Sequence, residues 1–153
     1  DLVGHAMAQE SLRTPICLDE SVVSLAHVEM ALDLKSCQFI NVDFGRVGGL
    51  TPAVAIHDAC HEHCTPCRLG ATPRSAIGSR AGLALAAKDN FTYPADWIDS
   101  PEMFEFDLAD PPSLTRLSDG QPLVAELWSE PGIGVVPDLA RLEEYSAAKA
   151  TIA

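Results

Sequence analysis

The chain has 153 residues, of which 47% are hydrophobic and 21% charged, so it can form a domain with a buried core. Its 22 acidic and 10 basic residues give a formal net charge of −12, which repels phosphate backbones and argues against nucleic acid as a partner. No apolar run approaches the roughly 18 residues of a membrane span, and the N-terminus lacks the features of a signal peptide. Together with five cysteines, an odd number that suits reduced thiols, this predicts no membrane partner and a cytoplasmic location.

The first two thirds of the chain alternate predicted helices and strands. Apolar periodicity predicts helices over residues 2–12, 24–34, 51–63 and 75–87. Short runs between them predict strands over residues 16–19, 37–43, 65–69 and 91–94. The strands begin roughly 25 residues apart, the length of one β/α unit. Four such units predict a parallel sheet, which is either half of an eight-unit barrel or a small open sheet.

The pattern changes after the fourth predicted strand. Residues 96–112 are loop-like, with a helical turn expected in DSPEMFEF, and Asp119-Gly120 predicts a β-hairpin over 113–126. A second turn is expected at 131–134, before a terminal helix over 138–148 that Asp138 caps. We therefore expect barrel units over 1–95 and a closing segment over 96–153 that packs on the same domain.

The stretch INVDFGRVGGL, residues 40–50, is a predicted strand that ends in an acid and continues through glycines into a helix. Asn41 and Asp43 are two residues apart, so they share one face of that strand. In an α/β barrel this face is the interior, and the carboxyl end of the strand carries the chemistry. Thr51 and Pro52 are the expected N-cap and first residue of the helix that follows.

Four ordered motifs carry a resemblance to a known family. They are LDES at 18–21, INVDFGRVGGL at 40–50, SAIGSRAGLALAA at 75–87 and PGIGV at 131–135. Their order and spacing resemble the carboxyl-terminal half of the enolase superfamily, closest to N-acylamino-acid racemases and o-succinylbenzoate synthases. The resemblance implies strands five to eight of a TIM-type barrel. It also implies Mg²⁺-dependent removal of a proton α to the carboxylate of a small molecule, by racemase or dehydratase chemistry.

The resemblance also assigns roles to individual residues. Asp19 matches the third metal ligand of the family, and the other two ligands and a strand-two lysine would precede residue 1. A single carboxylate holds Mg²⁺ weakly, so weak or no metal binding is expected of this chain alone. Asp43 stands where the family has its strand-six lysine, and Arg74 aligns with a glutamate of the strand-seven region. These two exchanged charges could form an ion pair that replaces the original catalytic polarity, or each side chain could simply be solvated at a loop. Asn41 and Asp96, near the ends of strands six and eight, are the expected substrate contacts, with a helix-capping or loop role as the alternative for Asp96.

Two further groups of residues leave alternatives open. The segment HDACHEHCTPC, residues 57–67, has helical and CxxC spacings that suit zinc, although core and surface roles are favoured because the family binds no metal there. The pair Gly48-Gly49 could offer amides to an anion or simply form a tight turn before a helix.

Four parallel strands cannot close a barrel, and exposing their inward apolar face to water would cost free energy. We therefore expect a homo-oligomer or a complementary amino-terminal half as partner. Two function classes remain, an enolase-type enzyme with altered or lost activity and a non-catalytic relative that keeps the half-barrel fold for binding or assembly.

Overall fold

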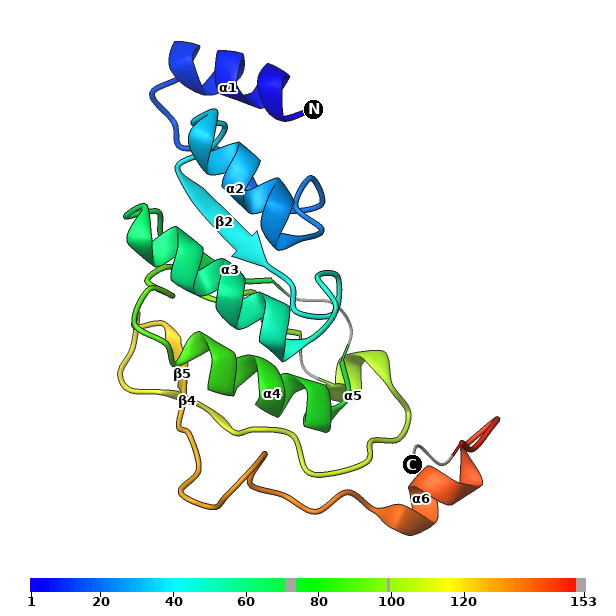
Figure 1. Ribbon diagram of the computed structural model, residues 1–153. Coiled ribbons are helices and arrows are strands. Elements are labelled where there is room, and N and C mark those ends of the chain that lie inside the picture. Colours follow the sequence, from blue (N-terminus) through cyan, green and yellow to red (C-terminus); the bar gives the residue numbers. More distant parts are fainter. Residues whose placement is uncertain (71–73, 99, 151–153) are drawn as a thin grey trace. The chain divides into compact units, whose positions relative to one another are not determined.

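The structure is a computed structural model that describes residues 1–70, 74–98 and 100–150 (Figure 1). The chain divides into two compact units. The sheet unit contains residues 1–72 and 82–98, and the closing unit contains residues 73–81 and 99–153. Helices alternate with parallel strands along the sheet unit, which confirms the predicted α/β class.

The sheet unit is built on three parallel strands, β1 (Cys17–Leu18), β2 (Phe39–Val42) and β3 (Cys67–Leu69), in that order. Leu18 pairs with Ile40 and Ile40 pairs with Cys67. The predicted fourth strand is reduced to one parallel bridge between Cys67 and Phe91. Pro94 has no N–H for a ladder, and its carbonyl accepts instead from Nε of Arg68 at 3.0 Å, so the pairing does not extend.

The hydrophobic core lies between one face of the sheet and two helices, α2 (Leu25–Asp33) and α3 (Leu50–Glu62). Figure 1 shows these helices beside β2. Ile40 and Val42 point to this face because alternate strand residues point the same way. The core residues of the two helices are Val28, Ala31, Ala53, Ile56 and Cys60. The helix predicted over residues 24–34 from its apolar periodicity is therefore confirmed as α2.

The opposite side of the strands is called the second face, defined by Cys17, Phe39, Asn41 and Arg68. Asn41 and Arg68 are paired in register across β2 and β3. Phe39 stacks on Tyr93, with ring centroids 4.3 Å apart and planes 6° from parallel. By alternation this is the face that a closed barrel would turn inward.

The ends of the helices follow their capping residues. Asp1 accepts from the N–H groups of Val3 and Gly4 at the start of α1 (Leu2–Ser11). Helix α3 begins at Leu50, so the prediction of Thr51 as its N-cap is wrong; Gly49, with φ 117°, occupies that position. Gly48 also has positive φ, and the Gly49 N–H donates to the Phe44 carbonyl at 2.7 Å, so the two glycines form the tight turn.

Helix α4 (Ala76–Ala86) begins in the closing unit and ends in the sheet unit. The Asp107 carboxylate accepts from the Ala76 N–H at 2.8 and 2.9 Å and so satisfies the first turn of α4. The expected helical turn is α5 (Ser100–Met103), although Asp99 lies outside the described residues.

The remainder of the closing unit contains the predicted hairpin and terminal helix. Strands β4 (Leu114–Arg116) and β5 (Leu123–Ala125) pair antiparallel. Helix α6 (Leu139–Glu144) is capped by Asp138 as predicted, but it ends earlier than residue 148. None of the helices within the described ranges has the length and apolarity that crossing a membrane requires.

Candidate active site at the carboxyl ends of the strands

Asp43 directly follows β2 and is buried, with 2% of its surface exposed. Its Oδ1 accepts from the Gly45 N–H at 3.0 Å, and its Oδ2 lies 3.9 Å from Nη2 of Arg46. The structure thus gives this strand end a buried carboxylate beside a cation. The predicted position of Asp43 at the functional end of the strand is consistent with this geometry.

Arg46 also connects Asp43 to the neighbouring strand. Its Nη1 donates to Oδ1 of Asp19, which directly follows β1. Partial burial lowers the pKa of Arg46, but the hydrogen bond to Asp19 and the charges of Asp19, Asp43 and Glu20 outweigh it, so the pKa is raised overall. The sequence reasoning did not single out Arg46, although its position three residues after Asp43 was the available signal.

Asp19 has the features of a single metal-ligating carboxylate. Its Oδ1 is oriented by Arg46, and Oδ2 accepts no hydrogen bond within the described part of the chain. Metal-bound carboxylates are commonly held in this way by a second group. Across the described ranges, no three His, Cys, Asp or Glu side chains are grouped to hold a metal ion. Asp19 therefore fits one ligand position of Mg²⁺, and further ligands would have to come from beyond these residues.

Asn41 lies on the second face, two residues before Asp43, and is 6% exposed. Its side-chain oxygen Oδ1 is buried and has no hydrogen-bond partner among the residues that the structure describes. Its amide lies against Gly70, where a side-chain carbon would approach Nδ2 to 2.6 Å. A buried acceptor without a partner carries a free-energy cost of about 1–3 kcal/mol, so it marks a place where a partner is expected.

Arg68 and Asp96 form an ion pair at the adjacent edge. Nη2 of Arg68 contacts Oδ1 of Asp96, and the Asp96 N–H donates to the Leu69 carbonyl at 3.0 Å. The predicted substrate residue Asp96 is therefore bonded to a neighbouring cation. Sequence reasoning missed Arg68, whose signal was a basic residue inside a predicted strand.

Arg74 belongs to the closing unit, where it lies two residues before the start of α4 and its side-chain stem lies beside Gly78. Asp43 belongs to the sheet unit. The ion pair expected between Asp43 and Arg74 would join the two units, and it stays a prediction.

The histidine and cysteine segment divides between the core and the surface. His57, Cys60 and Cys67 are buried, whereas His61, His63 and Cys64 are exposed. The Cys60 thiol hydrogen-bonds to Cys67, which together with burial raises the pKa of Cys60. Burial also raises the pKa of Cys17 and of Cys37 to about 11, so these thiols stay protonated at neutral pH.

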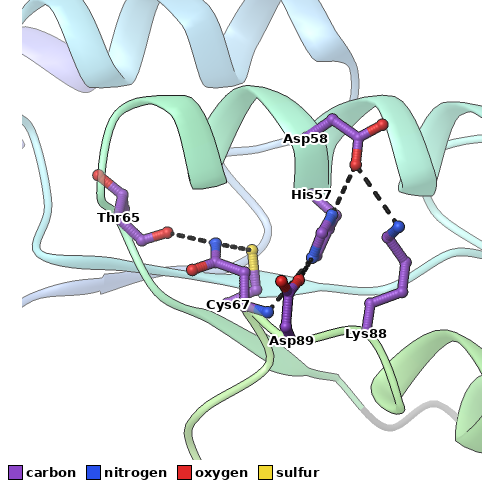
Figure 2. Close-up of polar contacts among 7 residues, drawn as sticks. His57, Asp58, Thr65, Cys67, Lys88 and Asp89 are labelled. Atoms are coloured by element: carbon purple, nitrogen blue, oxygen red, sulfur yellow. Dashed lines mark hydrogen bonds and ion pairs between the residues drawn. The ribbon is translucent and has the colours of Figure 1, made fainter.

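His57 organises a polar network at the start of β3 (Figure 2). Its Nδ1 lies 2.7 Å from Asp58, and its Nε2 accepts from the Asn90 N–H at 3.4 Å. The hydrogen bond to His57, assisted by the charge of Lys88, lowers the pKa of Asp58. The Asn90 side chain donates to the Thr65 carbonyl at 2.8 Å. This network ties α3 to the residues that form the bridge at Phe91.

Comparison with known proteins identifies the family. A family profile described as "Enolase C-terminal domain-like" matches residues 1–141. This chain belongs to that enolase family. An o-succinylbenzoate synthase from Geobacillus stearothermophilus is 39% identical over 151 residues, which is 95% of this chain and 38% of that protein. An N-succinylamino acid racemase from an Amycolatopsis species is 38% identical over 152 residues, 99% of this chain and 40% of that protein.

The solved structures agree with the sequence relatives. The crystal structure of an enolase superfamily member from Listeria innocua matches with a TM-score of 0.78 and 33% identity, over 97% of this chain and 38% of that one. The predicted resemblance is thus confirmed, including the match to a carboxyl-terminal portion. This enolase-type chain spans about 38% of the length of such relatives.

Proposed function

We propose that this chain forms the carboxyl-terminal half of an enolase-type site for a small carboxylate, in which lysine-dependent proton transfer is altered or lost. The observation that carries the proposal is the buried Asp43 at the end of β2, where the family resemblance calls for lysine. A lysine at this place can take a proton from a carbon acid when the surroundings lower the pKa of the lysine. An aspartate carries the opposite charge and has no cationic form.

A Mg²⁺ ion is part of the proposal, on the basis of the same family resemblance. Asp19 would supply one carboxylate to Mg²⁺, and Arg46 would hold that carboxylate in place. When bound, Mg²⁺ supplies positive charge that stabilises the enolate formed next to a substrate carboxylate. The residues of this chain would orient the ligand, with Asn41 and Asp96 on the second face and Asp43 at the strand end.

A partner is part of the proposal. Helices α2 and α3 cover one face of the sheet, and a parallel sheet is normally covered on both. The relatives are more than twice as long as this chain, which supports a complementary amino-terminal half on the same or another chain, or a homo-oligomer. Free thiols at all five cysteines support a reducing compartment such as the cytoplasm.

We also propose that Asp43 and Arg74 reverse the signs of charge that the family carries at these two positions, a lysine on strand six and a glutamate in the strand-seven region. If they form an ion pair, the pair would replace a catalytic lysine and a glutamate with a fixed contact. The contact would hold the strand-six end to the segment before α4.

A second candidate function is binding or assembly without catalysis. The carboxylates of Asp19 and Asp96 are each bonded to an arginine, and Asp43 has Arg46 nearby. Charges that neutralise one another in this way suit a stable binding surface as well as a reaction site.

Solvent exchange at the α-carbon of an N-succinyl amino acid distinguishes these functions. The full-length protein is incubated in heavy water with Mg²⁺, and proton NMR follows loss of the α-proton. We expect exchange at the rate of a protein-free solution if the activity is lost. Exchange that disappears in Asp43→Asn would indicate altered chemistry through Asp43. Fast Mg²⁺-dependent exchange that Asp43→Asn leaves unchanged would contradict the proposal, and tight ligand binding without exchange would favour the second function.

A further inference from the structure

Arg68 is a fixed cation on the second face of the sheet. Its Nε donates to the Pro94 carbonyl at 3.0 Å and its Nη2 contacts Asp96. The third nitrogen, Nη1, has no hydrogen-bond partner within the described residues, and the side chain is 32% exposed. Two contacts therefore hold the guanidinium in one orientation while further N–H donors remain available.

Asn41 lies directly across the strand pairing from Arg68. It is more than nine-tenths buried, and its Oδ1 lacks a partner in the part of the chain that the structure describes. The pairing thus places an orphaned acceptor next to a cation with spare donors, on the face that also carries Asp19 and Asp43. A ligand with a carboxylate and a nearby N–H group would satisfy both.

We propose that Arg68 binds the carboxylate of the ligand directly, positioned by Asp96, and that Asn41 accepts a hydrogen bond from an N–H group of the same ligand. This inference rests on the proposed function only for the class of ligand, a small carboxylate. It assigns recognition of the anion to a guanidinium, so binding should persist without a metal ion.

The alternative is that Arg68 and Asp96 only stabilise the sheet edge. A partly exposed ion pair is worth about 0–1 kcal/mol, so stability alone gives little reason for an arginine inside a strand. Arg46, a second cation near these strand ends, contacts Asp19 and lies near Asp43. Among the described residues Arg68 pairs with one carboxylate, Asp96, and therefore retains more capacity for an added anion.

Titration with succinate, in the presence of EDTA, tests the proposal in the full-length protein by calorimetry or NMR. Arg68→Gln should weaken succinate binding by about 10-fold or more, the effect of losing one charge-assisted hydrogen bond. Asp96→Asn should tighten binding several-fold, because the amide oxygen still holds Nη2 while a competing negative charge is removed. Arg13→Gln, an exposed control in the same unit, should bind like the wild type. Uncharged succinamide should bind more weakly than succinate.

Equal succinate affinity in the wild type and Arg68→Gln, or no binding to the wild type, would overturn the proposal. If Arg68→Gln fails to fold, the succinate affinity of Asp96→Asn tests the proposal instead. A purely structural ion pair predicts that this substitution leaves the affinity unchanged. These titrations contain no metal and involve no proton exchange. Their failure is therefore distinguishable from failure of the proposed function.

Discussion

Single residues at the strand ends account for most of the chemistry that this chain can carry. The period of two along β2 was sufficient to place Asn41 and Asp43 on one face from sequence. The structure adds that the two side chains differ in their partners. Asp43 is held by the Gly45 N–H and lies near Arg46, whereas Oδ1 of Asn41 has no partner among the described residues.

Gly70 is required for the position of Asn41. In Gly70→Ala the new methyl group would lie 2.6 Å from Nδ2 of Asn41, so the amide must move. We expect the free energy of unfolding to fall by about 1–3 kcal/mol, as for other overpacked sites. Gly45→Ala is the matched control, because its methyl group would meet Asp43 at an ordinary 3.4 Å and should change stability by about 0.5 kcal/mol or less. Urea denaturation measures both, and equal stability of the two variants would contradict this role.

At the scale of elements, the repeated β/α unit could be predicted from sequence but the lengths of its strands could not. Periodicity and spacing located every strand of the sheet, since apolar runs separated by amphipathic helices are distinctive. The fourth strand was overestimated because Pro94 interrupts the ladder. Arg46 and Arg68 were missed because Asp19 and Asp96, the carboxylates that they contact, are distant in sequence, and the only local signal was the spacing of Arg46 from Asp43.

The edge of the sheet at Phe91 depends on the network around His57. In His57→Ala the Asn90 N–H loses its acceptor and α3 loses a buried ring, so we expect a loss of about 2–4 kcal/mol in the free energy of unfolding. His61→Ala, on the same helix but exposed, should cost about 0.5 kcal/mol or less. Hydrogen exchange should also accelerate at the Cys67 amide, which donates to the Asn90 carbonyl at 2.8 Å. Equal effects of the two substitutions would show that the network does not hold this edge.

At the scale of the whole molecule, this chain is a carboxyl-terminal portion of an enolase-type fold. It spans about 38% of its relatives, and within the described residues Asp19 is the one metal ligand that we propose. A complete site therefore needs groups from the remainder of the barrel. We propose that this chain contributes the charge pattern at its strand ends, above all an aspartate, Asp43, where the family carries a lysine.

The most direct measurement of that claim is α-proton exchange by Asp43→Lys in heavy water, with Mg²⁺ and an N-succinyl amino acid. If the carboxylate at Asp43 is what disables proton transfer, the lysine should raise the exchange rate by about 100-fold or more over the wild type, the usual contribution of a positioned base. Affinities for Mg²⁺ and ligand are measured in parallel. An exchange rate no higher than that of the wild type, at equal affinities, would contradict the account.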